Sequence, residues 1–248
     1  MACWPLRPRR KFATPCDGGR HRAGRAPRWQ RAIVRAKTLV VTRALALLKQ
    51  VHADLDACTA CPNMIGPVVH GPPVLSHVFL LGQAPGPHEG KIGRPFAWTA
   101  GKTLFRWFEE SAGVSEERFR EGVYMAAVAR CFPGKARGGG DRRPDAAESL
   151  ACKTFLIREV DVLRPKLVLA VGTLAITEIL GDRVKGKKLD AIVGQTMRAP
   201  WLGHETDVIV LPHPSGASPW HKLEPGKTLL GHALERVKEH PAWIEAFA

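Results

Sequence analysis

Runs of apolar residues alternate with amphipathic segments along the chain from about Val40 onward. Short apolar runs bounded by turn residues are typical of buried strands and predict strands at 77–83, 123–129, 167–172 and 207–211. Apolar residues spaced three or four apart predict helices at 40–56, 99–112, 145–163, 173–180 and 225–239. Strands and helices that alternate in this way form parallel sheets through right-handed crossovers. The pattern therefore predicts an α/β fold with three layers, α/β/α, and a central, mainly parallel sheet of four strands.

Two chemically distinctive loops follow predicted strands. Gln83-Ala-Pro-Gly86 comes after the first strand, and His213-Pro-Ser215 comes after the fourth. Parallel strands end at the same edge of a sheet, and ligands bind beyond that edge in open α/β folds. We therefore expect both loops to line one site. A single histidine is more often structural than catalytic, but the position of His213 makes it a candidate for chemistry.

The formal net charge of +14 is concentrated near the start of the chain. Residues 1–37 hold eleven Lys or Arg against one acid, Asp17, which leaves only +4 for the remaining residues. This segment is rich in Arg, Pro and Gly and has no apolar periodicity, so we interpret it as a disordered basic extension. A non-specific phosphate-binding arm, a segment similar to a transit peptide and a misassigned start codon are the open alternatives for its role. Residues 38–248 are expected to form one α/β domain, whose mild charge is weak support for DNA binding.

Four of the six cysteines fall in the predicted domain, at Cys58, Cys61, Cys131 and Cys152. The first pair has the C-x2-C spacing with which one turn binds a metal, and four thiolates can hold a zinc ion or a 4Fe–4S cluster. The alternative is that they are buried as small apolar residues, which suits Cys152 best. The spacing favours a metal site without choosing between zinc and iron.

Together these motifs resemble the uracil-DNA glycosylase superfamily, and in particular its iron–sulfur bacterial and archaeal families. The similarity covers about residues 58–219. Gly82-Gln-Ala-Pro-Gly86 resembles the first superfamily motif, and His213-Pro-Ser215 resembles the second. Gly93-Arg-Pro-Phe96 is similar to the segment whose Phe stacks on the extruded base. The four cysteines fall at the positions of the family's cluster ligands, so the resemblance implies a 4Fe–4S cluster.

The motifs resemble a hybrid of two iron–sulfur families. Gln83 stands where the uracil-specific family has Glu, and Ala84 stands where some families have a water-activating Asp or Asn. Ala127 replaces the Asn that reads the base edge in the uracil-specific family. His88 and the Ala-Ala-Val run before Cys131 are instead similar to the family of broader specificity. We therefore expect relaxed base choice, with hypoxanthine or xanthine as further substrates.

The resemblance implies a monofunctional DNA N-glycosylase, which flips out uracil or another deaminated base and hydrolyses its N-glycosidic bond to begin base excision repair. We expect His213 to donate a hydrogen bond to the departing base. The other expected roles are water positioning by Gln83 and His88, base binding by Ala84, Phe96 and Ala127, and DNA binding by Ser215 and Ser218.

The expected partner is DNA that contains uracil or another deaminated base. The resemblance also implies a monomer in the bacterial cytoplasm, associated with the nucleoid through DNA. A lesion-binding iron–sulfur protein without catalysis is the rival interpretation, which Ala84 and Ala127 favour and His213 and Phe96 oppose. A cluster-bearing hydrolase of free nucleotides is a weaker rival, because the chain lacks a complete phosphate-binding loop.

Overall fold

The computed structural model describes residues 28–216 and 218–248. The chain divides into two compact units, Met1–Thr38 and Leu39–Ala248. Most of the predicted basic extension lies outside the described residues. Its last residues, 28–37, belong to helix α1 (Arg28–Asp56), which therefore begins earlier than the predicted helix at 40–56. Arg, Ala, Gln and Lys favour helices even where no apolar stripe marks one.

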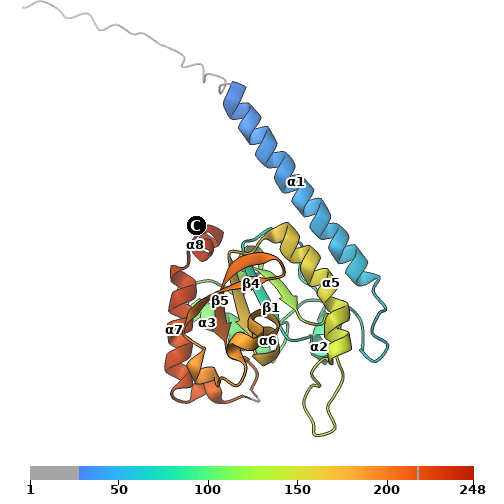
Figure 1. Cartoon of the computed structure of the whole chain (residues 1–248), viewed down its shortest axis with the longest axis vertical. Helices are drawn as coiled ribbons and strands as arrows, with labels where there is room; N and C mark the ends of the chain where they lie inside the picture. The colour runs from blue at the N-terminus through green and yellow to red at the C-terminus, as the bar shows by residue number, and fades with distance from the viewer. Residues whose placement is uncertain (1–27, 217) are drawn as a thin grey trace, which may run out of the picture. The chain divides into compact units, whose positions relative to one another are not determined.

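Five strands form one sheet in the order β2-β1-β3-β5-β4 (Figure 1). β1 pairs in parallel with β2 and β3, and β3 pairs in parallel with β5. β4 pairs antiparallel with β5 at the edge of the sheet. The strands are β1 (Val78–Gly82), β2 (Tyr124–Ala127), β3 (Leu167–Val171), β4 (Thr196–Trp201) and β5 (His204–Leu211). The α/β class and the four parallel strands are confirmed, and the prediction of four strands is corrected to five.

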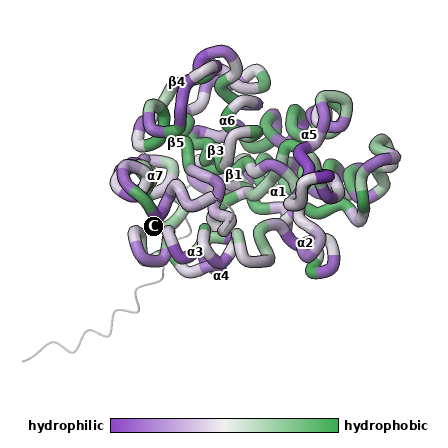
Figure 2. The backbone as a smooth tube through the Cα atoms, turned by 90° about the horizontal axis from the view of Figure 1, so that it is seen from below, coloured by the Kyte–Doolittle hydropathy of each residue, from purple (hydrophilic) through white to green (hydrophobic). Residues whose placement is uncertain are grey.

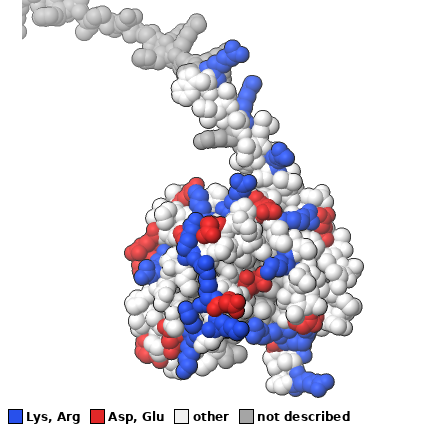
Figure 3. All heavy atoms as spheres, in the orientation of Figure 1, with Lys and Arg blue, Asp and Glu red and all other residues white. Residues whose placement is uncertain are grey.

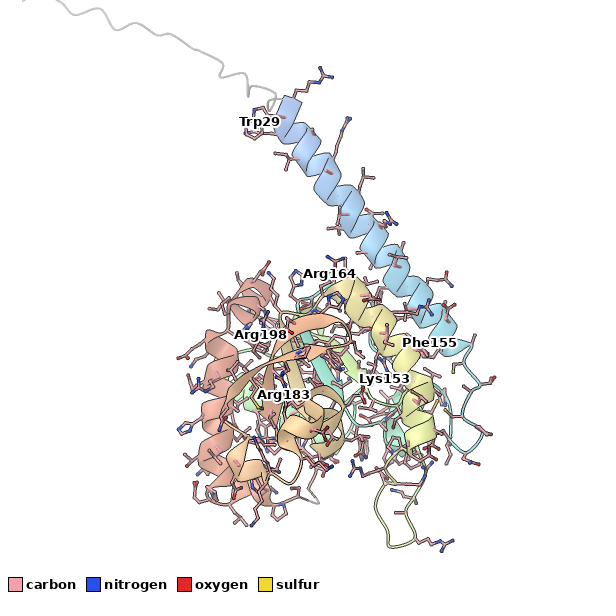
Figure 4. All side chains as sticks on the ribbon, viewed as in Figure 1. Trp29, Lys153, Phe155, Arg164, Arg183 and Arg198 are labelled. Carbon is pink, nitrogen blue, oxygen red and sulfur yellow. The ribbon has the colours of Figure 1, made fainter. Side chains whose placement is uncertain are left out.

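Helices cover both faces of the sheet, which gives the three predicted layers (Figure 2). Helices α3, α4, α7 and α8 form one connected layer, and α6 packs against β1, β3 and β4. Lys153 of α5, labelled in Figure 4, lies 2.7 Å from Glu178 of α6 in an ion pair between these neighbouring helices. The remaining helices are α2 (Pro87–Ile92), α3 (Thr99–Ala112), α4 (Glu116–Gly122), α5 (Ala146–Leu163), α6 (Thr173–Leu180), α7 (Gly226–Glu239) and α8 (Pro241–Phe247), with short 3-10 turns at Gly181–Val184, Leu189–Ala191 and Trp220–Lys222.

The two central strands β1 and β3 are buried at every position. Such continuous apolar runs are typical of parallel strands that helices cover on both faces. Each large apolar side chain buried there stabilises the fold by about 1.5–3 kcal/mol. The core therefore holds the ends of these strands rigidly, which matters because the loops that follow them line the site. None of the described helices is long and apolar enough to cross a membrane.

Candidate functional site

A pocket of about 760 Å³ opens beyond the carboxyl ends of the parallel strands. Its floor includes Gly82 at the end of β1, Ala127 at the end of β2 and Gly172 directly after β3. His213, two residues after β5, lies in the same pocket. Residues at or just beyond the ends of four strands that are distant in the sequence thus line one cavity, as expected for an open α/β sheet.

Every residue predicted to act in catalysis, base binding or DNA binding lines this pocket. The set comprises Gln83, Ala84, His88, Phe96, Ala127, His213, Ser215 and Ser218. The structure therefore brings together residues that the sequence separates by as many as 135 positions, the distance from Gln83 to Ser218. The individual roles assigned to them stay predictions.

His213 lies partly buried with a defined hydrogen-bonding pattern. The backbone N–H of Ser215 donates to its Nδ1 at 3.2 Å, which makes Nδ1 an acceptor. Burial lowers the pKa of His213, and the nearby charge of Asp141 opposes this effect more weakly. The ring is therefore neutral near pH 7 and carries its proton on Nε2, so that Nε2–H can donate to a ligand.

Phe96 is fixed by its backbone as well as by its ring. Its φ of 52° is unusual for a bulky residue, and Arg120 donates to its carbonyl oxygen at 3.2 Å. A Cβ on Gly101 would lie only 1.7 Å from that same oxygen, so only glycine fits there. The ring packs against Gly82 at the end of β1. These contacts hold an aromatic ring in the pocket in one orientation.

Glu89 connects the Gln83–Gly86 loop with the segment that carries Phe96. Its carboxylate accepts a hydrogen bond of 2.5 Å from the backbone N–H of Gly86, and it is also hydrogen bonded to the backbone of Phe96 and Ala97. Burial nevertheless raises the pKa of Glu89 above its ordinary value. The side chain caps α2 and ties the Gln83–Gly86 loop to the Phe96 segment.

A stacked aromatic pair lies on the pocket wall. The rings of His88 and Trp98 are 4.2 Å apart with an interplanar angle of 22°. Trp98 remains 46% exposed, so a large part of its surface is available to a ligand. The motifs predict a role for His88 but none for Trp98, because no pattern of spacing distinguishes Trp98 from an ordinary surface aromatic.

Three basic side chains of the loop between β2 and α5 lie at the pocket, and two of them form ion pairs, Lys135 with Asp141 and Arg142 with Glu148. Lys135, Arg142 and Arg143 from this loop line the cavity. On the face shown in Figure 3, Lys and Arg side chains form a band that runs down the folded body, with Asp and Glu side chains beside it. Arg198, for example, lies 3.2 Å from Asp207. The apolar pattern of the sequence indicates no strand or helix in this loop, although its place after a parallel strand could have indicated the site.

The four predicted metal ligands come from three parts of the unit. Cys58 and Cys61 follow α1, Cys131 follows β2, and Cys152 lies on α5. Burial, and then the charges of the other three thiols, raise the pKa of Cys131 to about 11. The four thiols are thus close enough to influence one another. Within residues 28–216 and 218–248, no group of three or more His, Cys, Asp or Glu side chains converges closely enough to hold a metal ion.

The backbone connects two of these cysteine segments directly. Ile65 and Phe132 exchange backbone hydrogen bonds of 2.7 and 3.0 Å, and Val69 donates to the Arg130 carbonyl at 2.8 Å. The loop that carries Cys58 and Cys61 therefore pairs with the segment that carries Cys131. In number and chemistry the donor set fits a four-thiolate cluster.

Comparisons with known proteins give a consistent result. A family model for the uracil DNA glycosylase superfamily matches residues 68–238. The Type-4 uracil-DNA glycosylase of Thermotoga maritima is 32% identical over 172 residues, which cover 68% of this chain and 82% of that protein. The Type-4 uracil-DNA glycosylase of Sulfurisphaera tokodaii is 30% identical over 145 residues, 57% of this chain and 61% of that protein. The enzyme of the same name from Pyrobaculum aerophilum is 27% identical over 175 residues, 68% and 83% of the two chains.

Proposed function

Because the chain belongs to the uracil DNA glycosylase superfamily, we propose that it removes uracil from DNA by hydrolysing the N-glycosidic bond. The superfamily and the enzyme class predicted from the motifs, a DNA N-glycosylase, are both confirmed by the relatives. The proposal extends to the first step of base excision repair on DNA, with a monomeric protein acting on a base that has been flipped out of the helix.

The position of His213 in the pocket, with its Nδ1 accepting from the Ser215 N–H, is the observation that carries this proposal. Cleavage of the C1′–N bond leaves an electron pair on the base and positive charge on the sugar. A preorganised N–H donor in a partly buried pocket stabilises the developing anion. The Nδ1 of His213 is engaged by the Ser215 N–H at 3.2 Å, which leaves Nε2–H for the base oxygen. Donation from a neutral ring requires no protonation near neutral pH.

Base flipping requires that the pocket restore the stacking energy lost in the helix, a few kcal/mol. The fixed ring of Phe96 supplies an aromatic surface at the end of β1. Ala84 and Ala127 leave space around the base and offer only backbone groups for recognition. Without an amide side chain at 127, the pocket discriminates weakly between uracil and other deaminated bases, so we propose hypoxanthine and xanthine as additional substrates.

The remaining predicted residues surround the sugar and the phosphates. Gln83 and His88 line the pocket and position the attacking water, and the stack on Trp98 holds the His88 ring. Ser215 and Ser218 follow β5 at the same edge and donate to the DNA backbone, as hydroxyl and turn N–H groups commonly do.

We assign the 4Fe–4S cluster to Cys58, Cys61, Cys131 and Cys152 on the chemistry of the four thiols. When bound, the cluster supplies a structural cross-link between the loop after α1, the segment after β2 and helix α5. The Arg130 guanidinium beside Cys131 forms a buried ion pair with Glu159 of α5, so this region is also held by the chain's own side chains.

Replacement of His213 with Ala tests the proposed donor. Loss of one preorganised donor should lower the single-turnover rate of uracil excision by about 100- to 1000-fold. The assay uses labelled duplexes with one uracil, hypoxanthine, xanthine or thymine mismatch, cleaved with alkali after incubation. His232→Ala, on the exposed surface of α7, is the matched control and should retain the full rate.

Equal rates for H213A and wild type would remove His213 from the mechanism. Cleavage of the uracil duplex alone would support the proposed glycosylase function but refute the proposal that hypoxanthine and xanthine are additional substrates. Binding to lesion duplexes without cleavage, by protein that retains its cluster, would instead favour the lesion-binding protein without chemistry that Ala84 and Ala127 suggest.

A further inference from the structure

Hydrolysis of a glycosidic bond needs a group that receives the proton of the attacking water. The loop position that serves this purpose in some families is occupied here by Ala84, which cannot do so. Among the described residues that line the pocket, two carry carboxylates, Glu89 and Asp141. The question is which of the two is available to a water molecule.

The carboxylate of Glu89 is already hydrogen bonded to backbone N–H groups. It caps α2, accepts from the Gly86 N–H at 2.5 Å and is hydrogen bonded to the backbone of Phe96 and Ala97. These bonds occupy the oxygen atoms that a water molecule would need. Glu89 therefore positions the loops of the site, and its carboxylate is poorly placed to accept a further proton.

Asp141 is held at the pocket by the hairpin-like loop between β2 and α5. Asp141 and Lys135 form an antiparallel bridge, and the backbone N–H of Arg142 donates to the Gly134 carbonyl at 2.9 Å. The ammonium group of Lys135 lies 2.6 Å from Oδ1 of Asp141. This ion pair orients the carboxylate while 42% of the Asp141 side chain stays exposed.

The second oxygen of Asp141 faces the motif loop. Oδ2 lies 3.6 Å from the point that a Cβ on Gly86 would occupy, so the two segments are in close approach. The charge of Asp141 also acts on the His213 ring across the pocket, in the direction that raises the pKa of His213. Asp141 thus lies close to the Gln83–Gly86 loop, and its charge also acts on His213 of the other motif loop.

We propose that Asp141 is the general base of this site and replaces the carboxylate or amide that position 84 lacks. This inference rests on the proposed glycosylase function. The C1′–N bond breaks first, and its electron pair leaves with the base, which His213 stabilises. The oxygen of a water molecule then forms a bond to C1′, and Oδ2 of Asp141 accepts the proton that this water loses. The base anion takes up a proton from solvent, and the carboxylate of Asp141 further stabilises the cationic sugar.

Asp141→Asn tests the proposal, because the amide keeps the size of the side chain but cannot accept this proton. A positioned general base contributes on the order of 100-fold or more, so the single-turnover rate on uracil DNA should fall by about 100-fold. The dissociation constant for a duplex with a non-cleavable 2′-fluoro uracil nucleotide should stay within about twofold. Asp161→Asn, whose exposed carboxylate pairs with His204 and lies outside the pocket, is the matched control and should match wild type.

Asp141→Ala provides a second readout that impaired folding would not produce. Removal of the side chain leaves space for a small carboxylate, so added formate should restore part of the rate of D141A but not raise the rate of wild type. A wild-type rate for D141N would overturn the proposal, as would a loss that arises entirely from weaker binding. If wild type is active and D141N has the same rate, the role of Asp141 as general base is refuted but the glycosylase function stands. If wild type cleaves no lesion, both the glycosylase function and the role of Asp141 are refuted.

Discussion

Gly172 and His213 meet where β3 and β5 end. Gly172 has a φ of 82°, and a Cβ at this position would lie 3.1 Å from Cδ2 of the His213 ring. The imidazole can rest against the backbone only because no side chain stands between them. The placement of the proposed donor therefore depends on a neighbour that has no functional group of its own.

Gly172→Ala should displace the His213 ring and lower the single-turnover rate of uracil excision by about 10-fold or more. The strained backbone should also destabilise the fold by about 1–3 kcal/mol, which thermal unfolding measures. Gly203→Ala is the control, since φ at Gly203 is 87° and nothing lies within 4 Å of a new Cβ. G203A should lose stability but keep its rate; an equal loss of rate in both variants would contradict the proposed contact.

Four elements, β4, α2, α4 and α8, are absent from what the apolar pattern predicts. Strand β4, with sequence TMRAPW, has only two buried positions and contains Pro200, which is tolerated because β4 is an edge strand. The apolar and polar residues of β4 alternate too weakly to distinguish this strand from a loop in the sequence. The short helices α2, α4 and α8 span six or seven residues each, too few for a clear period. The buried strands and long helices could be predicted because burial in the core requires apolar residues at regular spacing. The edge strand and the short helices form through tertiary contacts, which leave no such pattern in the sequence.

The sequence could indicate only those site residues that lie next to a recognisable strand. Gln83 directly follows the buried strand β1 and His213 lies two residues after β5, so the position of each could be inferred once the strand was recognised. Asp141 lies within a long loop after β2, and its approach to Gly86 depends on the bridge to Lys135. No pattern in the sequence specifies the path of that loop.

A buried polar network joins α1, β2 and α5. Nε2 of His52 lies 2.9 Å from the hydroxyl of Tyr124, and that hydroxyl donates to Glu159 at 2.7 Å. Because Tyr124 donates to Glu159, the hydroxyl accepts from Nε2–H of His52. Burial lowers the pKa of His52 from 6.5 to about 4, with smaller contributions from His70 and Arg130 and an opposing one from Asp56.

This network should make stability depend on pH. Unfolded His52 takes up a proton below about pH 6.5 and folded His52 only below about 4, so the folded state loses stability as the pH falls through this window. Between pH 7.5 and 5 the loss due to His52 should be about 2 kcal/mol. Urea unfolding at both pH values, on wild type and His52→Gln, measures it. An equally large pH effect in H52Q would show that other groups cause it.

Charge is distributed very unevenly over the whole molecule. Residues 1–37 carry +10 of the net +14. At the pocket, the basic side chains Lys135, Arg142 and Arg143 come from the loop between β2 and α5. We therefore expect general binding of DNA and excision at the pocket to depend on different parts of the chain.

Deletion of residues 1–27 tests this separation. The deleted segment holds seven Lys or Arg and one acid, Asp17. Each phosphate contact that it makes adds about 0.9 to the slope of log affinity against log salt, so the shortened protein should show a shallower slope. The single-turnover rate at saturating protein should not change. An unaltered slope, measured by fluorescence anisotropy on undamaged duplex between 50 and 200 mM salt, would show that this segment makes no phosphate contacts.

Release of the free base is the observation that distinguishes a glycosylase from a protein that only binds lesions. Wild-type protein, with its cluster intact, is incubated with a duplex that contains a single uracil, and the products are separated by chromatography. We predict that one equivalent of free uracil appears while the DNA strand stays intact until alkali is added. Absence of free uracil, from protein that binds the same duplex at moderate salt, would contradict the proposed function.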